Sequence, residues 1–186
     1  VMDDSWDIPK DVNDSPNPYL GCVELSSDRF PSFRGDAVER LKQLSEQIKS
    51  KGWKGVGGWI CAQKAETHAA IPEEEYWKQR IKAANAAGFD YWKVDWGKED
   101  RNGEWRRKLT AIGKRYAPHL YIEHALRNEF IEFSDVFRTY DVENITAQPI
   151  TIRRICDLLP YKTVEGAKGI INLSLIHISE PTRQAE

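Results

Sequence analysis

The stretch Gly88-Phe-Asp-Tyr-Trp-Lys-Val-Asp-Trp96 decides the fold that this sequence predicts. Its aromatic and β-branched residues favour a strand. The glycine at its start is a typical end for the helix predicted before it, over residues 73–87. Another helix is predicted after it, over residues 102–117, where Pro118 ends it. A strand between two helices is typical of a βα unit, the building block of parallel sheets that helices cover.

The same alternation continues on both sides of this stretch. Upstream, Asp36 and Glu39 have the spacing of a capping box, so a helix is predicted over residues 36–52, followed by a glycine-rich strand over residues 53–62. Downstream, the predicted elements are strands over residues 120–123, 136–140 and 169–172 and a helix over residues 150–159. The whole series predicts an α/β protein with a parallel sheet.

Two kinds of parallel fold have this alternation. An open doubly wound sheet of the dinucleotide-binding kind would carry a Gly-rich phosphate turn, which the chain lacks. A complete (β/α)₈ barrel needs about 250 residues, more than the 186 of this chain. We therefore interpret the sequence as a partial (β/α)₈ TIM barrel that is truncated at both ends.

Composition excludes two classes of partner. The chain has 27 Lys and Arg against 29 Asp and Glu, a net charge of -2, which predicts no nucleic-acid partner and no anionic membrane partner. No apolar run approaches the ~20 residues that a membrane helix needs. The three cysteines, at positions 22, 61 and 156, lack metal-ligand spacing, and we expect neither a metal nor a cofactor.

The last 14 residues, Leu173-Ser-Leu-Ile-His-Ile-Ser-Glu-Pro-Thr-Arg-Gln-Ala-Glu186, resemble a translated adapter from a short-read sequencing library. We treat this tail as non-native and exclude it from the functional argument. The remaining residues 1–172 form the predicted catalytic barrel domain, and the natural protein is expected to continue beyond Asn172.

Acidic residues gather at the ends of the predicted strands. Lys93 and Asp95 lie two apart, so a strand directs both side chains to the same face. A carboxylate in a buried strand needs a partner, and Lys93 is the nearest candidate for Asp95. Other acidic residues at predicted strand ends are Asp3, Asp4, Glu123 and Asp141. In a (β/α) barrel these positions converge on the active site.

Two carboxylates on either side of one bond are the groups that glycoside hydrolysis uses. One attacks the anomeric carbon, and the other donates and later removes a proton, which for retention requires a separation of ~5–5.5 Å. A neighbouring Lys would stabilise the charge of the attacking carboxylate. Trp59 and Trp96, near strand ends, are candidates for stacking on a sugar ring, whereas Trp53, Trp77 and Trp105 are predicted to pack helices against the sheet.

Four segments together resemble a known family. They are Val1-Met-Asp-Asp-Ser-Trp6, Asp28-Arg-Phe-Pro31, Gly88-Phe-Asp-Tyr-Trp-Lys-Val-Asp95 and Val136-Phe-Arg-Thr-Tyr-Asp141. In this order they resemble the family 27 glycoside hydrolases of clan D, the α-galactosidases and α-N-acetylgalactosaminidases. Family 36 of the same clan is also similar, especially around Gly58-Trp59. The resemblance implies a retaining hydrolase with a carbohydrate substrate, most simply an α-galactoside.

The resemblance also implies a role for each matched residue. Asp95 corresponds to the nucleophile and Asp141 to the acid/base. Sugar hydroxyls would be bound by Asp3, Asp4 and Lys93, the 2-position substituent would contact Glu123, and Arg138 would order the acid/base side.

The sequence departs from the family pattern at three places. Three positions separate Arg138 from Asp141 where the family has four, so Glu143 is an alternative acid/base. Ser5 replaces the usual Cys, and Trp96-Gly97 replaces the usual Asn-Cys. Two other functions therefore stay open. One is an enolase-like barrel enzyme in which Asp95, Glu123 and another carboxylate bind Mg²⁺. The other is a carbohydrate-binding pseudoenzyme.

Overall fold

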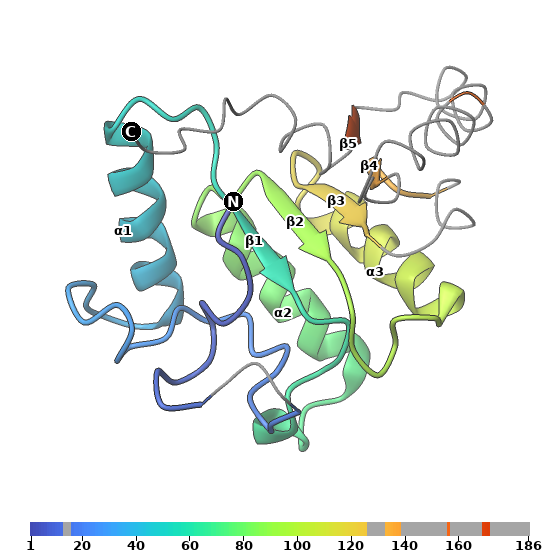
Figure 1. The fold of residues 1–186 in the computed structure, drawn as a ribbon, viewed down its shortest axis with the longest axis horizontal. Coiled ribbons are helices and arrows are strands. Elements are labelled where there is room, and N and C mark those ends of the chain that lie inside the picture. The colour runs from blue at the N-terminus through green and yellow to red at the C-terminus, as the bar shows by residue number, and fades with distance from the viewer. Residues whose placement is uncertain (13–15, 126–132, 139–155, 157–168, 172–186) are drawn as a thin grey trace, which may run out of the picture.

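A computed structural model of the chain describes residues 1–12, 16–125, 133–138, 156 and 169–171 (Figure 1). Its helices are α1 (Ala37–Ser50), α2 (Glu73–Ala86) and α3 (Gly103–Tyr116), with a short 3₁₀ helix η1 (Glu66–His68). Its strands are β1 (Gly57–Ile60), β2 (Tyr91–Val94), β3 (Tyr121–His124), β4 (Val136–Arg138) and β5 (Gly169–Ile171).

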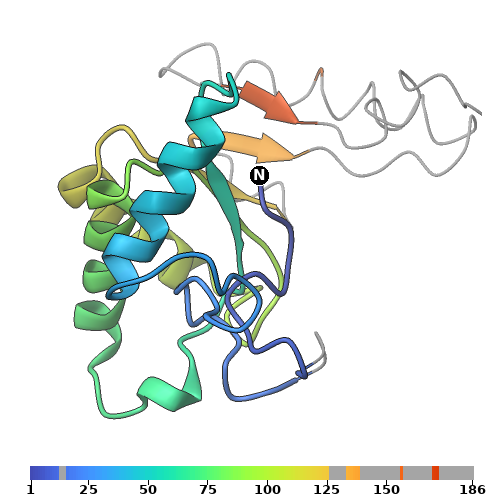
Figure 2. The same cartoon turned by 90° about the vertical axis from the view of Figure 1, so that its left-hand side faces the viewer.

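The strands form one parallel sheet in the order β1-β2-β3-β4-β5, which is also their order in the sequence. On the open side of β1, Met2 adds a parallel bridge to Gly58. A doubly wound sheet reverses its strand order partway, and the described strands show no such reversal. Sequential right-handed crossovers place their helices on one face of a sheet. Figures 1 and 2 show α2 and α3 together on one side of the sheet, with α1 beside α2. The predicted parallel α/β fold is confirmed, and the described strands form an open sheet.

The helices begin and end close to the predicted positions, because local capping signals define them. Asp36 accepts hydrogen bonds from the backbone N–H groups of Val38 and Glu39, and the Glu39 side chain accepts from the Asp36 N–H, which completes the predicted capping box. Asn102 caps α3 in a similar way through Trp105 N–H. Of the helix predicted over residues 150–159, only Cys156 is among the described residues, where it is helical and exposed.

The strand predicted over residues 53–62 is shorter than expected, since β1 begins only at Gly57. The prediction that Trp53 packs a helix against the sheet is therefore wrong. Trp53 lies in the connection between α1 and β1, where it is 70% exposed. The reason is that Lys51 and Gly52 turn the chain at the end of α1, and Gly52 adopts a positive φ of 91°.

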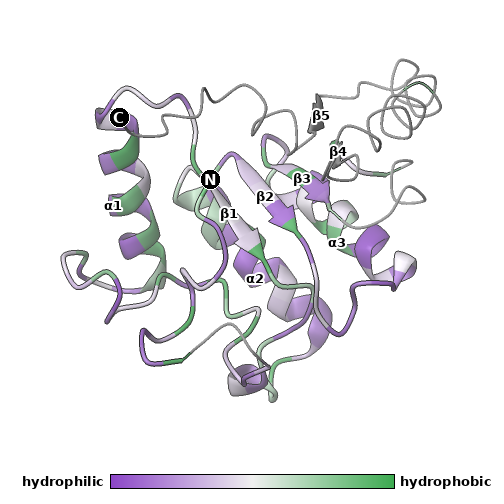
Figure 3. Ribbon diagram, viewed as in Figure 1, coloured by the Kyte–Doolittle hydropathy of each residue, from purple (hydrophilic) through white to green (hydrophobic). Residues whose placement is uncertain are grey.

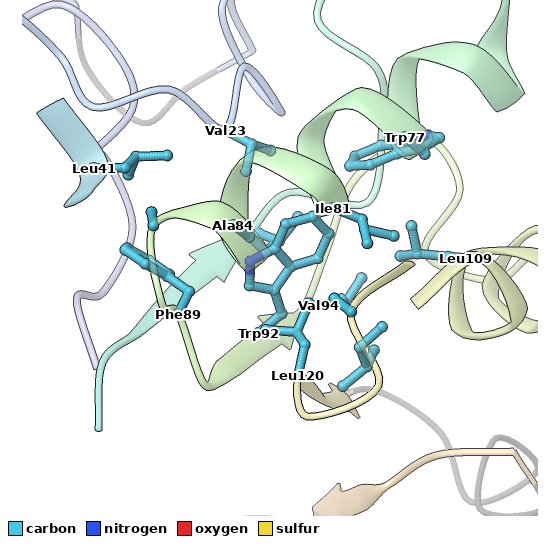
Figure 4. Packing of buried hydrophobic residues seen from close by; sticks show 14 of the residues in the cluster. Val23, Leu41, Trp77, Ile81, Ala84, Phe89, Trp92, Val94, Leu109 and Leu120 are labelled. Carbon is cyan, nitrogen blue, oxygen red and sulfur yellow. The ribbon is translucent and has the colours of Figure 1, made fainter. Parts of the chain in front are cut away.

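The core lies between the sheet and the helices. Trp92 and Val94 of β2 point from the sheet toward α2, where they pack among Ile81, Ala84 and Leu109 (Figure 4). Trp92 is fully buried. Because side chains alternate along a strand, the residues between these apolar ones face away from the helices.

Trp77 and Trp105 join α2 to α3, as predicted for packing tryptophans. Both are buried, and their rings meet edge to face with centroids 5.3 Å apart. Both indole N–H groups donate to the same oxygen of Glu73, at 2.7 and 3.0 Å. One carboxylate thus satisfies two buried donors at this helix junction.

Candidate active site

A row of polar and aromatic side chains crosses the sheet on the face away from the helices. Trp59 of β1, Lys93 of β2 and Glu123 of β3 are register partners in neighbouring strands. Register partners in a parallel sheet lie on the same face. Figure 3 shows the corresponding hydrophilic segments within β2 and β3.

Asp95 follows β2 directly and lies at the centre of this group. Its backbone N–H donates to Ile60 O at 3.0 Å, which holds the strand end in place. Its carboxylate is mostly buried, and Oδ2 accepts a hydrogen bond from Trp59 Nε1 at 3.2 Å. Lys93 Nζ lies 3.8 Å from the same Oδ2. The predicted pairing of Lys93 with Asp95 is confirmed, whereas the indole donor was not predicted.

Asp3, near the start of the chain, lies beside Lys93 in the same group of side chains. Met2 N–H donates to Gly57 O and Trp59 N–H donates to Met2 O, both at 2.9 Å, so Met2 forms an isolated parallel bridge beside β1. Asp3 follows Met2 directly, with Oδ1 3.4 Å from Lys93 Nζ. Lys93 thus contacts two of the predicted site carboxylates.

The chain reverses direction directly after Asp3. Asp4 is exposed at this turn, and Ser5 adopts a positive φ of 67°. The turn brings Trp6 back into the core, where its indole N–H donates to Trp59 O at 2.8 Å. Asp4 is therefore at the rim of the site rather than within the row on the sheet.

Glu123 differs from the other carboxylates in its burial. It is almost completely buried, and the hydroxyl of Tyr91 donates to its Oε2. Tyr91 stands two residues before Lys93 on the same face of β2. Glu123 was predicted at the site and Tyr91 was not, although the alternation of Tyr91 with Lys93 and Asp95 along the strand is a local signal for it.

Trp59 does not serve as the predicted stacking platform. It is 2% exposed, so neither face of its ring is open to a sugar. Its ring lies against Trp96, with centroids 5.2 Å apart, and its N–H is directed at Asp95. Trp59 therefore positions Asp95 instead of contacting a ligand through its ring.

A buried arginine of α3 holds the end of β2 from the helix side of the sheet. Arg106 of α3 is fully buried and donates to three main-chain carbonyls, those of Val94, Asp95 and Asp100. Desolvation by burial lowers the pKa of its guanidinium to about 10. Val94 O also accepts from Ala125 N–H in the sheet, while the bonds to Asp95 O and Asp100 O lie beyond the end of β2 and fix the backbone that carries Asp95.

His124 completes this support on the helix side of the sheet, as its alternation with Glu123 predicted. Arg106 Nη1 lies 3.2 Å from His124 Nδ1, and Thr110 Oγ1 lies 2.8 Å from Nε2. Because a guanidinium only donates, Nδ1 accepts and the ring proton is on Nε2. Thr110 in turn donates to the carbonyl of Arg106. His124 is thus a neutral packing residue in a closed hydrogen-bond network.

A second buried carboxyl, Asp7, was not predicted. It is 4% exposed and accepts a hydrogen bond from Val23 N–H at 2.9 Å. Desolvation by burial raises its pKa to about 6. Its negative charge adds to burial in raising the pKa of the Cys61 thiol. The sequence held no signal for Asp7, because only the return of the chain after Ser5 brings it inside.

The positions of the predicted acid/base residues relative to Asp95 are not described by the structure. Asp141 and its alternative Glu143 lie outside the described residues, and only the backbone of Arg138 is placed, in β4. Their roles stay predictions.

The described residues also bear on metal and membrane binding. They contain no group of three or more His, Cys, Asp or Glu side chains arranged to hold a metal ion. The Mg²⁺ site considered for Asp95 and Glu123 thus lacks a third carboxylate in this part of the chain. None of its helices is both long and apolar enough to span a bilayer.

No protein-family model and no curated protein matches the chain. The resemblance to clan D hydrolases therefore rests on the motifs alone, and its consequences are proposals.

Proposed function

We propose that this protein is a retaining glycoside hydrolase that acts on α-galactosides. The observation that carries the proposal is the contact of Lys93 Nζ with both Asp3 and Asp95, at 3.4 and 3.8 Å, at the carboxyl ends of parallel strands. Three residues that the resemblance marks as site residues are brought together from positions 90 residues apart in the sequence. The Asp95 carboxylate is 12% exposed and needs a partner for its charge, whereas the Asp3 side chain is 77% exposed and can reach a ligand from solvent.

We further propose that the sheet is an arc of a (β/α)₈ barrel. The sequential strand order and the helices on one face are the arrangement that a barrel requires. In a closed barrel the face away from the helices becomes the interior, and the carboxyl ends of the strands form the active-site mouth. Trp59, Lys93 and Glu123 would then line the interior, with Asp95 at the mouth.

The proposed mechanism is a double displacement. Asp95 attacks the anomeric carbon while an acid, for which Asp141 is the candidate, protonates the departing oxygen. The resulting glycosyl ester on Asp95 is hydrolysed by water, which the same second carboxylate deprotonates. Attack twice from opposite faces retains the anomeric configuration. Trp59 Nε1 and Lys93 Nζ hold Oδ2 of Asp95, so the attacking group keeps a fixed orientation.

The decisive test is the hydrolysis of an aryl α-galactoside by the full-length protein. We expect turnover that EDTA leaves unchanged, and a loss of at least about 1,000-fold in kcat for Asp95→Asn. Asp11→Asn is the matched control, because Asp11 is exposed and outside the site. Azide should restore turnover of Asp95→Gly and give the β-galactosyl azide, since the small anion takes the place of the missing carboxylate.

Three results would contradict the proposal in different ways. Loss of turnover in EDTA would favour the metal-dependent enzyme. Galactoside binding without turnover would favour the pseudoenzyme. Full activity of Asp95→Asn would remove Asp95 from the mechanism.

A further inference from the structure

Arg106 places a positive charge next to Asp95 on the helix side of the sheet. Its side chain is fully buried, and its Nη2 donates to the main-chain oxygen of Asp95 at 2.5 Å. Nothing in the mechanism above uses this charge. A buried charge acts on its neighbours more strongly than a solvated one, because less water and salt screen it.

The guanidinium of Arg106 keeps its proton at neutral pH. Desolvation by burial lowers its pKa to about 10, while the negative charges of Asp95 and Asp100 favour the protonated form. Two further bonds go to main-chain oxygens, from Nε to Asp100 O and from Nη1 to Val94 O, both at 2.9 Å. Carbonyl oxygens satisfy these donors without neutralising the cation, since they carry no net charge.

Asp95 thus lies between two cations on opposite faces of the sheet. Lys93 Nζ is 3.8 Å from its Oδ2 on one face, and Arg106 bonds its main chain on the face that α3 covers (Figure 1). The Asp95 side chain is 12% exposed, so little water screens either interaction. Because a Coulomb interaction is mutual, the charge that favours the protonated guanidinium is in turn stabilised by it.

The two steps of a double displacement change the charge of Asp95 in opposite directions. In the first step the carboxylate bonds to the anomeric carbon, and its negative charge is lost in the glycosyl ester. In the second step a water oxygen bonds to the anomeric carbon and the bond from that carbon to Asp95 breaks. The electron pair of the broken bond returns to the carboxylate, and the acid/base group takes the proton of the water. A cation beside Asp95 therefore stabilises the charge that develops in the second step.

We propose that Arg106 is a positioning residue that makes Asp95 a good leaving group when the glycosyl ester is hydrolysed. This rests on the proposed function, and it gives α3 a part in one step of the reaction. Lys93 divides its charge between Asp95 and Asp3, whereas Arg106 is buried on the helix side and acts only through Asp95.

The test separates the charge of Arg106 from its hydrogen bonds in the full-length protein. Arg106→Gln removes the charge and keeps an amide donor, whereas Arg106→Lys keeps the charge without the planar fork of donors. With a nitrophenyl α-galactoside we expect Arg106→Gln to accumulate the glycosyl ester, so that kcat and KM both fall about tenfold. The ester should be visible as a burst of nitrophenol and as a galactosyl adduct in the mass of the intact protein.

The other variants fix the interpretation of that adduct. Arg106→Lys should carry no more adduct than the unaltered protein, because the charge remains. Arg107→Gln is the matched control, since Arg107 is the exposed neighbour of Arg106 on α3. Added methanol should raise kcat of Arg106→Gln, because it competes with water for an ester whose breakdown limits turnover.

Two results would overturn the role of Arg106. An equal loss of kcat/KM in Arg106→Gln and Arg106→Lys, with no adduct in either, would show that Arg106 only supports the fold. Equal adduct in both variants would show that the hydrogen bonds matter and the charge does not. Should Arg106→Gln fail to fold, Arg106→Met, which fills the space with an uncharged chain, allows the same comparison.

The same experiment separates this proposal from the function on which it rests. If the unaltered protein does not hydrolyse the galactoside, the proposed function fails. If the unaltered protein turns over but Arg106→Gln forms no adduct, the function stands and the role of Arg106 is overturned.

Discussion

Lys93 joins Asp3 to Asp95, because its ammonium contacts both carboxylates. Replacement by Met keeps the length of the side chain and removes the charge. We expect Lys93→Met to lower kcat/KM on an aryl α-galactoside by about 10- to 100-fold, because a charge-assisted hydrogen bond contributes roughly 1.5–3 kcal/mol. The control is Lys42→Met on the exposed side of α1, which should leave kcat/KM unchanged. If kcat/KM of Lys93→Met is unchanged, Lys93 has no role in the site.

Asp7 makes stability depend on pH. Its folded pKa of about 6 lies above the ordinary aspartate pKa of 3.8, because burial disfavours the charged form. The folded state therefore holds the proton more tightly, and the stability that this contributes is complete below pH ~4 and is lost as pH rises through ~6. At neutral pH the loss is on the order of 3 kcal/mol.

Asp7→Asn should remove that dependence. Asn can still accept the hydrogen bond from Val23 N–H but carries no charge to bury. We expect urea unfolding to show Asp7→Asn about as stable as the unaltered chain at pH 4 and on the order of 3 kcal/mol more stable at pH 8. Parallel stability curves for the two proteins across this range would contradict the assigned burial of the charge.

At the scale of elements, the junction of α2 and α3 depends on the carboxylate of Glu73 near the start of α2. Glu73→Ala leaves the buried indole N–H groups of Trp77 and Trp105 without their shared acceptor. We expect a loss of about 2–4 kcal/mol in the free energy of unfolding, since each buried unsatisfied donor costs ~1–3 kcal/mol. The neighbouring Glu74→Ala is the control, because Glu74 is exposed and should change stability by less than ~0.5 kcal/mol. Equal denaturation midpoints for the two variants would count against this junction.

The elements also show which features a sequence predicts. The helices α1 and α3 were predictable because their caps, Asp36 and Asn102, act within a single turn. The pairing of Lys93 with Asp95 was predictable because strand alternation is local. The burial of Trp59 and the exposure of Trp53 were not, since both depend on where β1 begins and on how residues 1–6 return to pack against it. Asp7 and the Tyr91–Glu123 contact likewise depend on distant segments, which no local pattern encodes.

At the scale of the whole molecule, ligand binding should stabilise the entire fold, because the site joins segments from both ends of the described core. Galactose that binds only the folded state should raise the unfolding free energy by about 2.7 kcal/mol at 100 times its dissociation constant. We expect a corresponding rise in Tm by calorimetry, and a smaller rise for Lys93→Met at the same galactose concentration. Glucose, which differs at one hydroxyl, is the matched ligand control. A rise that is the same with both sugars would indicate a nonspecific solvent effect.

The sequential strand order has a consequence for how the chain is made. Each strand pairs with the one completed just before it, so a ribosome that delivers the chain from its N-terminus supplies every strand with a neighbour that already exists. Contacts between adjacent βα units keep the sequence separation of most sheet contacts modest, which favours rapid folding. Lys93 can meet Asp3 as soon as β2 has emerged, and Glu123 joins them one unit later. The site would thus be assembled in the order of translation.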